Sequence, residues 1–289
     1  MQFQRAIPPG FEGVQVGEVF AVARKADLAL ATGLAETAGG AREWYGLGRR
    51  EAGAFQLIVV RGSAGLGRDQ VPQWGAGFTF PLARTILIRA DAGEPYRILW
   101  HELAHLVLSD VIRTRVPLWF NEGYAAVAAG ELDRLLDLRL NLSVARGEIP
   151  GFFELDRALR ASEPTVGVAY ALAASAVAML ARRHPDRSLA PLLGRLAAGE
   201  SFDAAVLATT GSSLGRFEEE WQRDVRLRYG LFGWVMAGGL WVLAAGLVIA
   251  AVWLRRRRDR PRRLALDQGW VVELSEPDPA PLDELEPGP

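Results

Sequence analysis

Residues 101–105 of this chain read HELAH, and two of its three histidines lie there. On a helix, side chains four residues apart lie on one face, so both imidazoles can reach a single metal ion at about 2.0–2.1 Å. Glu102 would project beside them, where it can take a proton from a metal-bound water. Leucines at 99, 103 and 106 would hold the opposite face in the core. The alternatives are a chance match or two ordinary core histidines.

A catalytic zinc usually has three protein ligands and one open position for water. The chain has no cysteine, so the third ligand must be a carboxylate or His184. The segment PLWFNEGYA at 117–125 supplies Glu122, and the spacing from His105 allows one helix to end and an antiparallel helix to begin. The alternative for Glu122 is a helix-start glutamate favoured by the helix dipole.

HELAH followed by WFNEGYA resembles the gluzincins, especially the peptidase MA-like domain family and, more distantly, the zinc aminopeptidases related to leukotriene A4 hydrolase. The resemblance extends over roughly residues 14–229. It implies that His101, His105 and Glu122 bind Zn²⁺ and that Glu102 is the general base. It also implies that Tyr170, at the head of a later helix, stabilises the oxyanion. The alternative for Tyr170 is core packing.

The sequence departs from the aminopeptidases before the zinc helix. They bind the substrate amine through a Gly-x-Met-Glu-Asn segment, whereas residues 74–80 here read WGAGFTF and contain no glutamate. An exopeptidase is therefore not supported, although an edge strand at this place can pair with an extended peptide. A thermolysin-like alternative makes His184 the oxyanion donor, but its setting, ARRHPDR, is typical of an exposed helix end.

Residues 231–254 form a run without charged side chains. This run is long enough for one transmembrane helix across a bilayer of about 30 Å. Seven arginines follow within 255–263, so the positive-inside rule predicts a cytoplasmic C-terminal tail and an extracytoplasmic catalytic domain. No apolar signal segment is visible near residue 1. We therefore expect either that the span drives translocation or that the sequence begins downstream of the true start codon.

Periodicity and turn residues predict an α+β fold, with a small mixed sheet followed by a helical lobe, as in a thermolysin-like zincin core. The expected strands are 14–22, 55–60, 77–80 and 84–89. The expected helices are 26–44, 95–110, 121–146, 165–183, 187–198, 201–208 and 213–228. Phe217 and Trp221 in the last helix are expected to be packing residues. The predicted domains are a metallopeptidase domain (1–229), a transmembrane helix (230–254), and a basic segment with an acidic, proline-rich disordered tail (255–289).

The expected function is hydrolysis of peptide bonds in a peptide or protein substrate. A net charge of −1 with no basic patch in the soluble part argues against a nucleic-acid partner. The main alternative is a zinc-stabilised, non-catalytic binding module on a membrane stalk. A scaffold that recruits partners through its tail is another. An intramembrane protease is excluded, because the HELAH helix is too short and polar to span and only one transmembrane segment is predicted.

Overall fold

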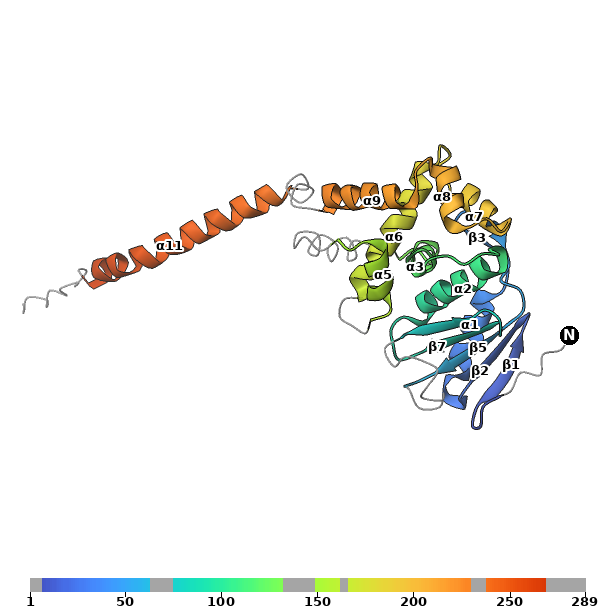
Figure 1. Cartoon of the computed structure of the whole chain (residues 1–289). Helices are drawn as coiled ribbons and strands as arrows, with labels where there is room; N and C mark the ends of the chain where they lie inside the picture. Colours follow the sequence, from blue (N-terminus) through green and yellow to red (C-terminus); the bar gives the residue numbers. More distant parts are fainter. Residues whose placement is uncertain (1–6, 63–74, 132–148, 162–165, 230–237, 269–289) are drawn as a thin grey trace, which may run out of the picture. The chain divides into compact units, whose positions relative to one another are not determined.

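The computed structural model describes residues 7–62, 75–131, 149–161, 166–229 and 238–268 (Figure 1). The chain forms two compact units, residues 1–234 and 235–289. The first unit has the predicted α+β composition, with a small mixed sheet followed by a helical lobe.

The sheet has the order β1-β2-β5-β7-β6. Its strands are β1 (Glu12–Val16), β2 (Val19–Ala23), β5 (Phe55–Val60), β6 (Gly77–Phe80) and β7 (Thr85–Arg89). The central pairs β2–β5 and β5–β7 are parallel, whereas β1–β2 and β6–β7 are antiparallel. β6 is therefore an edge strand, and α1 (Leu28–Ala38) and α2 (Pro95–Val111) pack on the sheet and on each other (Figure 1).

Two predictions for the N-terminal region were wrong. The single strand expected at 14–22 is the hairpin β1–β2, which turns at Gly17 with a φ of +55°, a conformation that glycine adopts without steric cost. The helix expected at 26–44 begins with a short 3-10 turn, η1 (Lys25–Asp27), and continues as α1 only to Ala38. Gly39 and Gly40 end it, because glycine weakens a helix. β3 (Arg42–Trp44) then pairs with β4 (Gly48–Arg50).

α2 begins where the sequence predicts. Pro95 is its first residue, and the carboxylate of Glu94 accepts hydrogen bonds from the backbone N–H groups of Tyr96 and Arg97. The expected leucine face is confirmed, since Leu99, Leu103 and Leu106 are fully buried. The histidines therefore lie on the opposite face of α2.

The helical lobe follows α2. Its helices are α3 (Leu118–Ala128), α5 (Phe152–Leu159), α6 (Val166–Arg183), α7 (Ala190–Ala197), α8 (Phe202–Thr210) and α9 (Leu214–Tyr229). α3 starts three residues before the predicted 121 and ends at Ala128, so the prediction of an unbroken helix from 121 to 146 was wrong; Gly130, with a φ of +73°, follows the helix end. The predicted continuation of that helix over 132–146 lies outside the described residues. α5 was not predicted from the sequence.

Aromatic side chains form the centre of the lobe. Trp119 of α3 stacks on Phe152 of α5 with ring centroids 4.2 Å apart, and Phe152 stacks in turn on Trp221 of α9 at 5.0 Å. The indole N–H of Trp221 donates to Ser175 Oγ of α6 at 2.9 Å. Phe217 and Trp221 are fully buried, as expected for packing residues. This cluster joins α3, which carries Glu122, to α5, α6 and α9.

The second unit contains α11 (Leu240–Gln268). No helix among the residues that the structure describes is both long enough and apolar enough to cross a membrane. Residues 231–237 of the predicted span lie outside the described residues. α11 continues through the basic segment into residues predicted to be disordered, because arginine is a good helix former and Arg257 also lies over the Trp253 ring, 3.8 Å from its centroid. Residues 269–289 are not described.

Candidate metal centre

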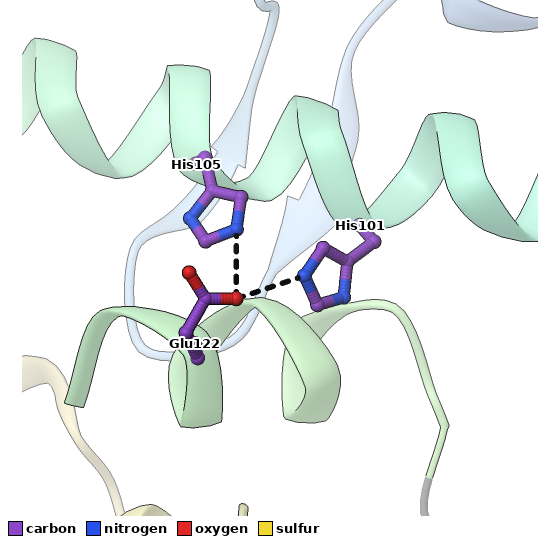
Figure 2. A group of neighbouring side chains, drawn as sticks. All are labelled: His101, His105 and Glu122. Carbon is purple, nitrogen blue, oxygen red and sulfur yellow. Dashed lines mark hydrogen bonds and ion pairs between the residues drawn. The ribbon is translucent and has the colours of Figure 1, made fainter. Parts of the chain in front are cut away.

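His101, His105 and Glu122 come together between α2 and α3 (Figure 2). His101 Nε2 lies 3.4 Å from Glu122 Oε2, and His105 Nε2 lies 3.5 Å from the same oxygen. The three potential ligand atoms all lie within 4.8 Å of one another. One carboxylate oxygen thus faces both imidazoles, as the two predicted helices require.

Glu122 lies in the second turn of α3, one turn later than the sequence analysis assumed. A glutamate there is too far along the helix to be explained by the dipole of the helix N-terminus, which acts within the first turn. Asp156 of α5 caps that terminus instead, since its carboxylate accepts from the backbone N–H groups of Leu118 and Trp119. The helix-start explanation of Glu122 is therefore weakened.

The remaining ring nitrogens of both histidines also have partners. His101 Nδ1 lies 3.3 Å from Glu131 Oε2, and His105 Nδ1 lies 3.2 Å from Asn121 Oδ1. With a metal bound, oxygen acceptors at these positions would hold the proton of each imidazole on Nδ1 and leave each Nε2 lone pair for the metal. This is the usual outer arrangement around metal-binding histidines. Neither partner was predicted from the sequence.

Glu102 is buried, with 6% of its surface exposed, and it faces the edge strand β6. Thr79 Oγ1 of that strand lies 2.7 Å from Glu102 Oε2 and 2.9 Å from the Glu102 carbonyl oxygen. A Cβ atom at Gly77 would lie only 2.6 Å from Glu102 Oε1, so glycine is required for this close approach. Burial raises the pKa of the Glu102 carboxyl above its ordinary value. β6 therefore fixes the carboxylate from one side.

Tyr170 lies beside His101, near the start of α6. Its ring centroid is 5.9 Å from that of His101, and its side chain lines the same cleft. Burial and the charges of Glu122 and Glu102 raise the pKa of the Tyr170 phenol, so it stays protonated and able to donate. The structure thus brings Tyr170 to the predicted position.

His184 does not join this group. It follows the last residue of α6, about 20 Å along the helix from Tyr170 at about 1.5 Å per residue. Its Nδ1 lies 3.3 Å from the backbone N of Asp186. His184 thus lies at a helix end, as predicted, although it is only partly exposed, and neither the third-ligand nor the oxyanion alternative is supported for it.

The electrostatics of the group favour a cation between the ligand atoms. Burial alone would lower the pKa of both imidazoles, but hydrogen bonding to Glu122 and Glu131 raises the pKa of His101 to about 10. Glu122 also raises the pKa of His105. Burial disfavours ionised Glu122, yet the imidazoles hold its pKa well below the usual value. A bound dication would supply the positive charge that protonation otherwise provides.

The donor set fits zinc in a catalytic site. Two imidazoles and one carboxylate are the ligands of several zinc hydrolases, and a catalytic site leaves one position open. Here the open side faces a cleft of about 1150 Å³, which His101, Glu102, His105, Glu122 and Tyr170 all line. The oriented Nδ1 atoms are a second, independent sign of a metal site.

Comparison with known proteins agrees with this geometry. The sequence profile of the Peptidase MA superfamily matches residues 68–226, which is more than half of the chain. The match contains α2, α3, α6 and the edge strand β6. A search of curated proteins gives no significant match.

Proposed function

Since this chain belongs to the peptidase MA superfamily, we propose that it is a zinc-dependent peptidase. His101, His105 and Glu122 are the metal ligands in this proposal, and Glu102 is the general base. The observation that carries it is the convergence of these ligand atoms within 4.8 Å beside a buried carboxylate on an open cleft. A purely structural zinc is normally closed by four protein ligands, which argues against the non-catalytic binding module.

Zinc bound in such a site supplies Lewis acidity, which activates water and polarises a carbonyl group. Glu102, held by Thr79, accepts the proton of the attacking water and transfers it to the leaving amine. Tyr170 donates a hydrogen bond to the oxygen that becomes negative during the attack. Glu131 and Asn121 keep the two imidazoles in the tautomer that can bind metal.

The substrate binds along β6 in this proposal. Within the described residues β6 pairs only with β7, and Gly77, Phe78 and Thr79 of β6 line the cleft. An extended peptide can add to such an edge as a further strand, and antiparallel pairing is the more stable form. Both ends of the peptide then extend past the metal centre, which favours cleavage within a chain.

We further propose that the uncharged run 231–254 anchors the peptidase in a membrane, with the C-terminal tail in the cytoplasm and the catalytic unit outside. The support is the uncharged run 231–254 and the arginines after it. The apolar side chains of α11 from residue 240 to residue 254 are all exposed. An apolar surface of this size is typical of a site that contacts a membrane or another protein. A lipid bilayer covers every side of a helix, as this pattern requires.

Removing and restoring the metal tests the proposed function. The full chain, purified in detergent, should hydrolyse peptides from a mixed library, lose that activity with a chelator and regain it when zinc is added. The activity should depend on the metal because, in this proposal, the metal supplies the Lewis acidity that activates water and polarises the carbonyl group. Peptide hydrolysis that is unaffected by complete loss of divalent metal would exclude this mechanism.

A further inference from the structure

The cleft extends beyond the metal centre toward the C-terminal end of α2. Arg115, in the loop after α2, and Arg160, at the end of α5, both line it. They are the only arginine or lysine residues among the described residues that line this cleft. The carboxylates in the cleft lie elsewhere, since Glu122 and Glu131 contact His101 and Glu102 contacts Thr79 of β6. The cleft is therefore acidic at the metal and basic at one end.

Arg115 and Arg160 both line the cleft, and they belong to segments that meet where α5 packs against the start of α3. Asp156 joins α5 to the start of α3 by accepting hydrogen bonds from Leu118 and Trp119, and this contact brings the 115–118 loop beside α5. Arg160 Nη1 lies 3.4 Å from the backbone oxygen of Asp156, one turn earlier on α5. The loop that contains Arg115 therefore leads directly into a contact with the helix that Arg160 ends.

Both guanidinium groups are available to a ligand. Each side chain is exposed, and within the described part of the chain neither makes an ion pair. Arginines elsewhere in the first unit, such as Arg61, Arg84 and Arg195, contact carboxylates. A guanidinium group recognises a carboxylate well because its planar N–H groups match the two oxygens.

The direction of β6 decides which part of the substrate reaches this end. A Cβ at Gly77, where β6 begins, would touch Ile98 and Glu102. Beyond the end of β6, Arg84 forms an ion pair with Asp110, near the C-terminus of α2, at 2.7 Å. β6 and α2 therefore run in the same direction. A peptide antiparallel to β6 places its residues before the scissile bond near the end of α2.

We propose that Arg115 and Arg160 form a subsite for an acidic side chain, Asp or Glu, on the amino-terminal side of the scissile bond. This inference rests on the proposed peptidase function and on antiparallel binding to β6. The free carboxylate of a peptide lies at its other end, so the anion recognised here must be a side chain. The two arginines set sequence preference and take no part in the chemical step.

Peptide pairs that differ by one charge test the subsite. Cleavage sites of the zinc-loaded full chain are mapped first on a peptide mixture. One cleaved peptide is then synthesised with Glu or Gln at each of the three positions before the bond, and separately after it. The ratio of kcat/KM for Glu over Gln should be about 10 at one position before the bond, as expected for hydrogen bonds to a charged group. Binding of the same peptides by fluorescence anisotropy gives a ratio that does not require turnover.

The chain offers a matched control. Arg115→Glu with Arg160→Glu should bring the Glu/Gln ratio to 1 or below. Arg113→Glu with Arg157→Glu makes the same change in charge at two exposed arginines that do not line the cleft, and it should leave the ratio unchanged. A native ratio near 1, equal loss in both double variants, or a preference only after the bond would each overturn the proposal. Absence of all hydrolysis would instead contradict the peptidase function, and the binding ratio would still decide the subsite.

Discussion

At the scale of single residues, Thr79 is the side chain that most directly positions the general base. Its hydroxyl contacts both the carboxylate and the carbonyl oxygen of Glu102. It does not belong to the HELAH motif and precedes Glu102 by more than twenty residues. Its role follows from the packing of β6 against α2 and was not visible in the sequence.

Thr79→Val should lower kcat about 10- to 100-fold, because a hydrogen bond to a charged group contributes about 1.5–3 kcal/mol. KM and bound zinc should stay near native values, since Thr79 contacts none of the proposed ligands. Thr79→Ser, which keeps the hydroxyl, should restore most of the turnover. A kcat in Thr79→Val equal to that of the native protein would show that Thr79 does not position the base.

The metal-site residues divide into those that the sequence could predict and those that it could not. His101, Glu102 and His105 are predictable because helical periodicity brings residues four apart together. To identify Glu122 as a ligand, a turn and a second helix must also be predicted. The spacing from His105 allows both, and the resemblance to the gluzincins implies that Glu122 is the third ligand. Glu131 follows α3 after Gly130, which has a φ of +73°. Nothing in its local sequence marks it as a partner of His101, because only the path of the folded chain brings it there.

At the scale of elements, the contact between α3 and α6 determines where Glu122 lies. The next residue, Gly123, faces α6, and a Cβ there would lie 2.4 Å from the backbone oxygen of Ala173. Backbone atoms of a helix cannot move aside as a side-chain terminus can. The two helices therefore need glycine at this position to hold the third ligand against the histidines.

Gly123→Ala should reduce stability by about 1–3 kcal/mol, the usual cost of overpacking, and should weaken zinc binding by displacing α3. Gly194→Ala is a suitable control, because it lies within α7 and a Cβ there meets no atom within 4 Å. It should increase stability by about 0.5–1 kcal/mol. Urea unfolding and zinc titration of the full chain measure both quantities. Equal stability and equal zinc affinity in the two variants would contradict this account of the α3–α6 contact.

Element types were more predictable than element ends. α2 was located closely because Pro95 and the capping Glu94 mark its start. The hairpin at Gly17 was missed because apolar residues on both sides of a tight turn look like one strand. α1 was predicted to be too long, since the pairing of Arg42–Trp44 with β4 depends on a partner later in the chain. Both errors concern short hairpins, in which a tight turn interrupts residues that look like one continuous element.

At the scale of the whole molecule, the arginines after residue 254 predict on which side of the membrane each end of the chain lies. A reporter fused after Pro289 should be cytoplasmic, because positively charged flanks are retained on that side. Protease added to intact cells should then remove the catalytic unit. A protected catalytic unit together with an external reporter would reverse the proposed orientation.

The central claim is that one chain binds one zinc ion and uses Glu102 as the base in peptide hydrolysis. The most direct test measures bound zinc and peptide turnover on the same preparations of the full chain. Glu102→Gln should retain about one zinc per chain and fold normally, yet lose about 10²–10⁴-fold in turnover, the usual contribution of a positioned base. Glu122→Gln should lose zinc itself, because an anionic ligand is removed. Full turnover in Glu102→Gln, or zinc loss matching that of Glu122→Gln, would contradict the account.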